Sequence, residues 1–246
     1  MKEFLLHSIL AGQRPAVPHA QSIVNLHSGL VEAREVLTRF EDVDGRMCTV
    51  GNLLEDVTLP PDMRIMLDLL CLGSVFEGLA HHPITDHLIF INLHPTTLES
   101  PDFWKRIQPW IWNLSIPPHR LVLEITETYV LHDLDQLQSY ASRLRELGLR
   151  IAVDDLGSGA ASLSHMSRLE PDFIKADRSL VERVHERPYQ AALLNALALF
   201  AKRMGVGFIA EGIETPEDLA TIRQAEVPWG QGYILGEPER LILPEA

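Results

Sequence analysis

Two adjacent aspartates, Asp154 and Asp155, end an apolar segment of strand length, and a glycine-rich turn from Gly157 to Gly159 follows them. Adjacent carboxylates repel each other and lose hydration when they are half buried. A cation usually offsets that cost, and a divalent metal ion suits paired carboxylates. A strand followed by a solvated Asx-type turn explains the same residues without any chemistry. The pair alone leaves both interpretations open, so the decision depends on what the other strands carry.

Polar residues also end most of the other segments whose pattern predicts a strand. Such segments alternate with segments of helical periodicity, which predicts a parallel sheet; with a length of 246 residues, this pattern favours a (β/α)8 barrel. The carboxyl ends of barrel strands meet on one face, where barrel enzymes carry their catalytic groups. Packing poorly explains a polar residue at nearly every strand end, so a functional cluster is favoured. The residues expected in it are Asn92, Glu124, Asp154, Asp155, Lys175, Glu211, Glu214 and Gln231.

Ordinary start and stop signals bound the expected elements. Residues 21–26 and 33–37 predict a hairpin, which places Glu35 inside a strand. Proline near the first helical position and glycine after the last one mark several helices. Helices are expected at 62–80, 101–113, 133–147 and 188–204, and strands at 88–92, 121–127, 172–177, 206–214 and 229–234.

A cluster of carboxylate and amide oxygens suits Mg²⁺, Mn²⁺ or Ca²⁺ and not a thiolate or imidazole metal site. Two such ions can clamp the attacking and leaving oxygens of a phosphodiester displacement. Lys175 is the protein cation expected among the acids, where it could hold a phosphoryl oxygen or act as a Schiff-base nucleophile. The surrounding acids would keep its amine protonated, which counts against the nucleophile.

Composition narrows the function classes further. The formal net charge of −13 argues against a broad basic surface for DNA or RNA. No apolar run approaches the ~18 residues of a membrane span, and residues 1–11 predict a first helix instead of a signal peptide, so the cytoplasm is expected. The two cysteines, Cys48 and Cys71, are expected to be reduced.

A series of short motifs in a fixed order carries a family resemblance. The motifs are Gln21-Ser22-Ile23-Val24, Glu35-Val36-Leu37-Thr38-Arg39, Asn92-Leu93, Glu124-Ile125-Thr126-Glu127, Asp154-Asp155-Leu156-Gly157-Ser158-Gly159, Ile174-Lys175-Ala176-Asp177-Arg178-Ser179, Ala210-Glu211-Gly212-Ile213-Glu214-Thr215 and Gln231-Gly232-Tyr233. Through them the chain resembles the EAL family of cyclic di-GMP phosphodiesterases over nearly its whole length. The resemblance implies a TIM-like (β/α)8 barrel with an antiparallel first strand. One domain is expected over residues 1–246, with its core at about 4–240.

The resemblance also implies roles by position. Metal ligands would be Glu35, Asn92, Glu124 and Asp154 for one ion, with Asp155 joining Asp154 at a second. Lys175 would hold the catalytic water, and Glu211 would act as general base or water-mediated ligand. Dinucleotide contacts would come from Gln21, Leu37, Arg39, Asp177 and Gln231, and the loop after Asp155 would be braced by Glu127 and Glu214. The implied reaction opens cyclic di-GMP to linear pGpG with two Mg²⁺ or Mn²⁺ ions. Ca²⁺ is expected to bind without supporting turnover, and a homodimer and a regulatory protein partner are expected.

Several residues depart from the family pattern without removing an expected metal ligand. The family's Glu-Ala-Leu reads Glu35-Val36-Leu37 here, and Glu237 stands where a basic residue is common. Leu156, Ser158, Ala160 and Ala161 replace larger or more polar residues of the family's loop. Three hypotheses therefore remain: an active phosphodiesterase, an EAL-type receptor or interaction module without turnover, and a Schiff-base barrel enzyme.

Overall fold

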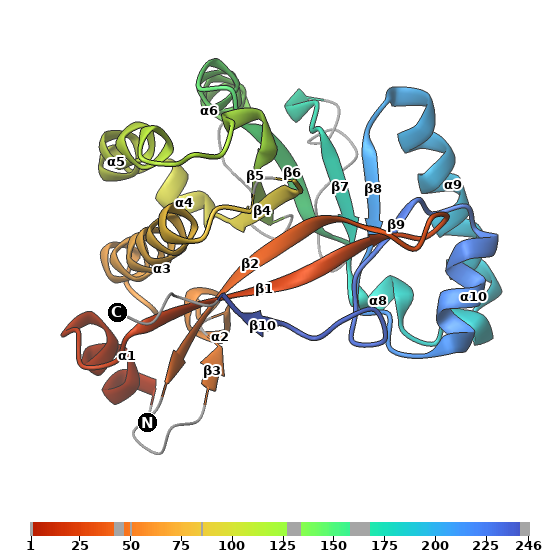
Figure 1. Ribbon diagram of the computed structural model, residues 1–246, viewed down its shortest axis with the longest axis horizontal. Coiled ribbons are helices and arrows are strands. Elements are labelled where there is room, and N and C mark those ends of the chain that lie inside the picture. The colour runs from red at the N-terminus through yellow and green to blue at the C-terminus, as the bar shows by residue number, and fades with distance from the viewer. Residues whose placement is uncertain are drawn as a thin grey trace.

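The computed structural model describes residues 2–41, 47–49, 51–84, 86–126, 134–157 and 168–241. Within these residues, eight strands close into a barrel in the order β1-β9-β8-β7-β6-β5-β4-β2 and back to β1 (Figure 1). This confirms the predicted TIM-like barrel. The strands are β1 Ala16–Asn25, β2 Val31–Glu41, β4 Leu88–Asn92, β5 Leu121–Thr126, β6 Arg150–Leu156, β7 Phe173–Ala176, β8 Gly207–Ala210 and β9 Trp229–Gly230.

The first strand runs against its neighbours, as expected. β1 is antiparallel to both β2 and β9, whereas the pairs from β2 through β4 to β9 are parallel. The β1–β2 hairpin turns at Asn25, whose Oδ1 accepts the backbone N–H groups of His27 and Ser28 at 3.0 and 3.1 Å. Two short strands extend the sheet beyond the barrel, β3 (Met47–Thr49) on β2 and β10 (Glu239–Arg240) on β1.

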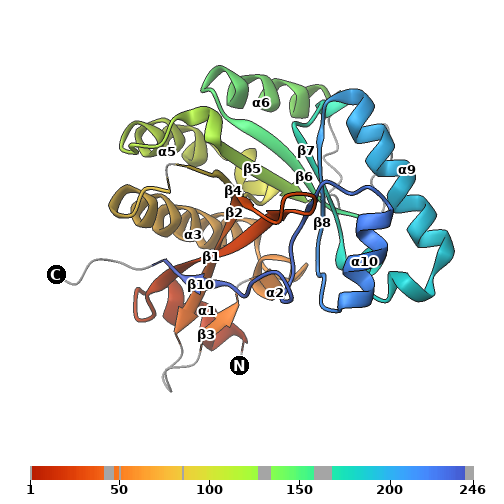
Figure 2. The ribbon, with the colours of Figure 1, turned by 45° about the vertical axis from the view of Figure 1, so that its right-hand side comes forward.

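Helices surround the barrel on its outer side (Figure 2). Their limits follow the sequence signals closely: Ser100 accepts the N–H of Asp102 before α5, and Gly205 ends α9 in the left-handed conformation that favours glycine. The helices are α1 Lys2–Leu10, α2 Gly51–Leu54, α3 Pro61–His81, α4 Pro95–Leu98, α5 Pro101–Trp112, α6 Leu134–Glu146, α8 Arg178–Val181, α9 Pro188–Met204 and α10 Pro216–Gln224. In the part of the chain that the structure describes, no helix combines the length and apolarity needed to cross a membrane.

Strand alternation divides the core into an outer and an inner part. Odd-numbered residues of β4 and β5, such as Ile91 and Leu123, pack outward against the helices. The inner part is a compact apolar layer in which Phe90 and Phe173 meet edge to face at 5.0 Å between ring centroids. Its buried members are Ile23, Ala33, Phe90, Val122, Ala152, Phe173 and Ile209, with Trp229 packed against them.

Candidate active site

The site follows from the two-residue period of the strands. One step from the apolar layer towards the carboxyl ends of the parallel strands, every barrel strand places a polar residue on the same inner face. In the antiparallel β1 that step runs backwards along the chain, from Ile23 to Gln21. The resulting polar layer is Gln21, Glu35, Asn92, Glu124, Asp154, Lys175, Glu211 and Gln231. The layer contains the strand-end residues that the sequence predicted, except Asp155, which lies beside it near Asp154 and Glu211, and Glu214, which lies outside it.

Lys175 occupies the centre of this layer with its side chain 1% exposed. Its Nζ lies 2.6 Å from Glu124 Oε1 and 2.5 Å from Glu211 Oε1. Asp154 Oδ1 and Glu35 Oε2 follow at 3.4 and 3.7 Å. Four carboxylates thus surround one ammonium group, and one positive charge cannot compensate all of them.

The pKa values reflect this imbalance. Burial raises the pKa values of Glu124 and Glu211 well above their ordinary range, and the neighbouring acids add to the effect. Burial acts in the same direction on Glu35, but Lys175 and two side-chain hydrogen bonds outweigh it, so its pKa is lowered. Burial would lower the pKa of Lys175, yet the four acids raise it well above its usual value. The close contacts to Glu124 and Glu211 and the raised pKa both favour the protonated amine, which argues against a role as Schiff-base nucleophile.

Glu35 is held by two amide side chains, one at the end of β4 and one directly after β9. Asn92 Nδ2 donates to Glu35 Oε1 at 2.7 Å, and Gln231 Nε2 donates to Glu35 Oε2 at 2.6 Å. Gln231 also donates to Gln21 Oε1 at 3.0 Å, and Gln21 in turn donates to the carbonyl of Gly236 at 2.9 Å. Glu35 is thereby held in one orientation, as a metal-binding carboxylate requires.

Asp155 reaches the same site through a local change of backbone. It has a left-handed φ of 59°, and the pairing of β6 with β7 is irregular between Val153 and Leu156. Its backbone N–H donates to Asp154 Oδ1 at 2.8 Å. Burial and the charge of Asp154 raise the pKa of Asp155 to about 7. Because of this change in backbone, the adjacent carboxylates of Asp154 and Asp155 line the same cavity.

The donor set fits a hard divalent cation. Asp154, Asp155 and Glu211 offer carboxylate oxygens that all lie within 4.8 Å of one another. Glu124 Oε2 is buried without a hydrogen-bond partner among the described residues. An excess of buried carboxylate over ammonium, with one oxygen unpartnered, is the environment that Mg²⁺, Mn²⁺ or Ca²⁺ stabilises.

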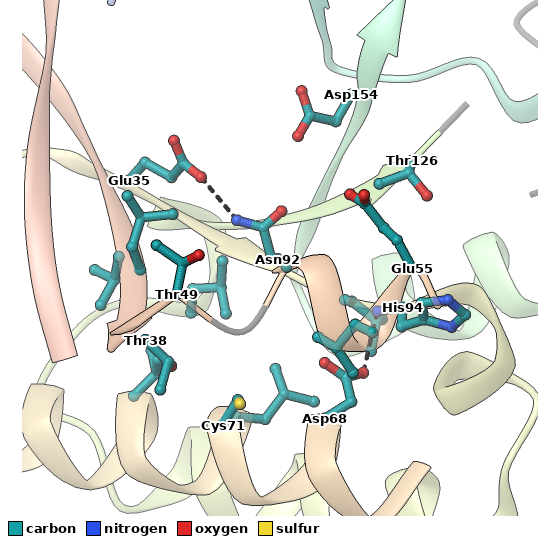
Figure 3. A pocket seen from close by; sticks show the side chains of 18 of the residues that line it. Glu35, Thr38, Thr49, Glu55, Asp68, Cys71, Asn92, His94, Thr126 and Asp154 are labelled. Carbon is teal, nitrogen blue, oxygen red and sulfur yellow. Dashed lines mark hydrogen bonds between the residues drawn. The ribbon is translucent and has the colours of Figure 1, made fainter. Parts of the chain in front are cut away.

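A cavity of about 930 Å³ opens beside this cluster. Glu35, Asn92, Asp154 and Asp155 line it, and Figure 3 shows that the first three point into it. Among the residues expected to contact a dinucleotide, three also line this cavity: Leu37, Arg39 and Asp177. Asp177 additionally caps α8 by accepting the N–H of Ser179 at 2.8 Å.

The other expected residues lie to the side. Gln21, Gln231, Glu211 and Glu214 line a smaller adjoining hollow of about 210 Å³, to which Glu35 also contributes. Glu214 is exposed and pairs with Arg178 at 3.0 Å, so it contacts the start of α8 and not the acid cluster. Glu127 and the altered residues Ser158, Ala160 and Ala161 lie outside the described residues.

Among the cavity residues that the sequence analysis missed are Glu55, Arg64, Asp68 and His94. Asp68 is 3% exposed on α3, between the buried residues Leu67 and Leu69. A carboxylate on the apolar face of a predicted helix was a usable signal, because such a group needs partners. Glu55 and His94 stand in connecting segments, where the sequence pattern gave no comparable signal.

Comparison with known proteins identifies the family to which this fold and polar layer belong. An EAL domain model matches residues 6–238. The chain belongs to the EAL domain family. This EAL domain is 28% identical over 222 residues to the cyclic di-GMP phosphodiesterase PdeA of Borreliella burgdorferi, covering 89% of this chain and 33% of that protein. It is 29% identical over 209 residues to the probable cyclic di-GMP phosphodiesterase PdeA of Escherichia coli, covering 84% and 28%. The chain thus spans about a third of the length of these relatives.

Solved structures show the same fold. BlrP1 of Klebsiella pneumoniae, as a calcium/cy-diGMP complex, matches this EAL domain with a TM-score of 0.82 at 26% identity, covering 93% of this chain and 57% of that one. The YkuI protein of Bacillus subtilis, with an EAL domain in complex with substrate c-di-GMP and calcium, matches with a TM-score of 0.84 at 24% identity, covering 100% and 60%.

Proposed function

We propose that this EAL domain hydrolyses cyclic di-GMP to linear pGpG in a reaction that depends on Mg²⁺ or Mn²⁺. The observation that carries the proposal is the polar layer: four carboxylates surround Lys175 beside a cavity of about 930 Å³, and three of them are buried while Glu211 is partly exposed. Relatives named cyclic di-GMP phosphodiesterases and BlrP1 complexes with cy-diGMP and manganese or calcium support the choice of substrate and metal.

The residues that would hold the ions divide into two groups around Asp154. Glu35, Asn92, Glu124 and Asp154 would hold one ion, and Asp155 with Asp154 would hold the second. When bound, the ions would supply positive charge for the phosphate oxygens and make a water more acidic. Ca²⁺ is expected to bind to the same oxygens without supporting turnover.

Lys175 and Glu211 would position and deprotonate the attacking water. Their charged groups lie 2.5 Å apart, so a water beside them can donate a proton to Glu211 while accepting a hydrogen bond from Lys175 Nζ. The raised pKa of Glu211, caused first by burial, makes this carboxylate a stronger base than a solvated one. Water adds a hydroxyl to phosphorus, the P–O3′ bond breaks, and the 3′ oxygen gains a proton, which yields pGpG.

The cavity wall would position the dinucleotide. Arg39 carries a planar guanidinium that matches phosphate oxygens, and Leu37 offers an apolar surface to a base. Asp177 also lines the cavity and would offer a carboxylate to N–H donors of the ligand. Gln21 and Gln231 would act from the adjoining hollow.

Chromatography of cyclic di-GMP after incubation with the protein and Mg²⁺ or Mn²⁺ tests the proposal. The wild-type protein should convert the substrate to pGpG, and Glu211→Gln should lower the rate at least ~100-fold. The result that would overturn the proposal is tight binding of cyclic di-GMP without cleavage in either metal, with an affinity that Glu35→Ala does not change. Such a protein would be a receptor.

We also propose a homodimer formed through α9. Exposed apolar side chains gather on this helix: Tyr189, Leu193, Leu199, Phe200 and Met204. Contiguous apolar surface of this kind marks interfaces. Light scattering should give the dimer mass for wild type and the monomer mass for Phe200→Asp; a monomeric wild type would contradict this.

A further inference from the structure

Of the four carboxylates around Lys175, that of Glu211 is the most exposed. Its side chain is 18% exposed, whereas the other three are at most 9% exposed. The other three also lie within strands, but β8 ends at Ala210 and Glu211 follows it. The backbone N–H of Glu211 donates to the carbonyl of Ala176 at 3.0 Å, directly beyond the last paired residues of β7 and β8. The position of this carboxylate therefore depends on what holds residues 211–214.

Arg178, the first residue of α8, lies across this segment. Its aliphatic stem packs on Gly212, where an added Cβ would lie 2.7 Å from Arg178 Cγ and 2.8 Å from Arg178 Cβ. Gly212 has a left-handed φ of +66°, so the chain turns directly beside the stem. The guanidinium then reaches Glu214 with both terminal nitrogens: Nη1 lies 3.0 Å from Oε1, and Nη2 donates to Oε2 at 3.2 Å. One side chain thus spans the segment from Gly212 to Glu214.

The other side of the segment is fixed by the end of β9. The N–H of Ile213 donates to the carbonyl of Gln231 at 3.1 Å, and the side chain of Ile213 is fully buried. A Cβ at Gly232 would lie 2.1 Å from the carbonyl oxygen of Ile213, so the two backbones are in close contact. Arg178 supplies the corresponding contact on the β7 side. Residues 211–214 are therefore held between β9 and this arginine.

The ion pair between Arg178 and Glu214 is exposed, so it is expected to contribute little to folding. The two side chains are 51% and 37% exposed, and solvent screens pairs of this kind. Two parallel contacts between a guanidinium and a carboxylate nevertheless fix their mutual orientation. A small displacement of a group that acts on the substrate lowers a rate steeply. The consequence of this contact is therefore expected in turnover and not in stability.

We propose that Arg178 is a positioning residue for Glu211: by holding Gly212 and Glu214, it keeps the Glu211 carboxylate beside Lys175 and the attacking water. The inference rests on the proposed function, in which Glu211 accepts the proton of that water. Arg178 also lines the small hollow that Glu211 lines. Its guanidinium is already paired there with Glu214, and Glu182 Oε1 lies 3.6 Å from its Nη2. This pairing favours a positioning role over binding of a ligand phosphate.

Steady-state cleavage of cyclic di-GMP in Mn²⁺, followed by chromatography, tests the inference. Arg178→Met should lower kcat by ~10-fold and leave KM unchanged, because the contact holds the base and not the substrate. Arg178→Lys should recover part of the loss, since an ammonium on an aliphatic stem can still pair with Glu214. The matched control is Arg183→Met, which removes a nearby exposed ion pair with Glu186 and should match wild type.

A double variant tests whether Arg178 acts through Glu214. Arg178→Met, Glu214→Ala and the combination should lower kcat by the same factor, because each breaks the same contact. A combination that restores the kcat of wild type would overturn the inference, because Arg178 would then only neutralise the charge of Glu214. A raised KM with an unchanged kcat in Arg178→Met would also overturn it, since Arg178 would then bind the substrate.

Unfolding in urea and Mn²⁺ calorimetry separate positioning from a general loss of structure. Arg178→Met should match Arg183→Met in both measurements. A loss of stability or of Mn²⁺ affinity in parallel with kcat would overturn the inference, because Arg178 would then support the fold or a metal ligand. Unchanged kcat in Arg178→Met, with an active wild type, would overturn this inference alone. A wild type that leaves cyclic di-GMP intact with both Mn²⁺ and Mg²⁺ would refute the proposed function, and this inference with it.

Discussion

Replacement of Lys175 by methionine should separate the stability of the polar layer from its chemistry. Methionine has a similar length and no charge, so Lys175→Met leaves buried carboxylates without their ammonium partner. The contacts that are lost measure 2.6, 2.5, 3.4 and 3.7 Å, to Glu124, Glu211, Asp154 and Glu35. At an effective dielectric constant of about 20, each is a gross attraction of about 4–7 kcal/mol between full charges.

The net effect is smaller because burial of the ammonium and repulsion among the acids already oppose these attractions. Removing one partner of a buried ionic group typically destabilises a protein by about 3–5 kcal/mol. We expect that loss for Lys175→Met in EDTA at neutral pH, measured as the free energy of unfolding in urea. Mn²⁺ should stabilise the variant more than it stabilises wild type, because the ion then has no ammonium to compete with for the carboxylates. Turnover should be lost in both conditions.

The matched control is Lys105→Met, which removes the exposed pair with Asp102 on α5. Lys105→Met should have the same free energy of unfolding in urea as wild type, because solvent screens exposed ion pairs. If Lys175→Met were as stable as Lys105→Met in EDTA, the account of a charge-compensated polar layer would be refuted.

Three further variants test other parts of the structure. Gln231→Leu should weaken Mn²⁺ binding by about 10–100-fold in calorimetry, because Gln231 Nε2 donates a hydrogen bond of 2.6 Å that orients Glu35. An unchanged Mn²⁺ affinity would show that Glu35 is not a metal ligand. Gly232→Ala should lower the stability in urea by about 1–3 kcal/mol or more, because its Cβ would meet the carbonyl oxygen of Ile213 at 2.1 Å; a neutral result would contradict this close approach. His185 forms a hydrogen bond with Asp218, and this contact raises the pKa of the imidazole. The stabilisation by the ion pair is therefore fully present below the unfolded pKa of about 6.5 and is lost as the pH rises through the folded pKa. The stability advantage of wild type over His185→Gln should therefore shrink as the pH rises from about 6.5 through the raised folded pKa, and a constant difference would refute the ion pair.

Local sequence signals predicted the helices and the barrel well. The helix expected at 188–204 is observed as Pro188–Met204, because a proline at its start and a glycine at its end both act locally. The polar strand ends converge as predicted, since alternation and barrel closure alone place Asn92 and Glu124 in one layer.

Strand limits and tertiary partners were harder to predict. The strands expected at 206–214 and 229–234 are observed only as Gly207–Ala210 and Trp229–Gly230. Beyond these points the chain turns, with Gly212 at a φ of +66°, so Glu214 leaves the inner face. Which carboxylates contact Lys175, and at what distances, depends on contacts between distant segments, which the local patterns do not specify.

The metal dependence of cyclic di-GMP cleavage tests the central claim most directly. The protein is treated with excess EDTA, assayed by chromatography, and assayed again after Mn²⁺ is restored, beside Glu35→Gln. We predict no pGpG in EDTA, recovery of cleavage by wild type with Mn²⁺, and no recovery by Glu35→Gln. Cleavage that persists in EDTA, or an intact substrate with both Mn²⁺ and Mg²⁺, would contradict a metal-dependent phosphodiesterase at this polar layer.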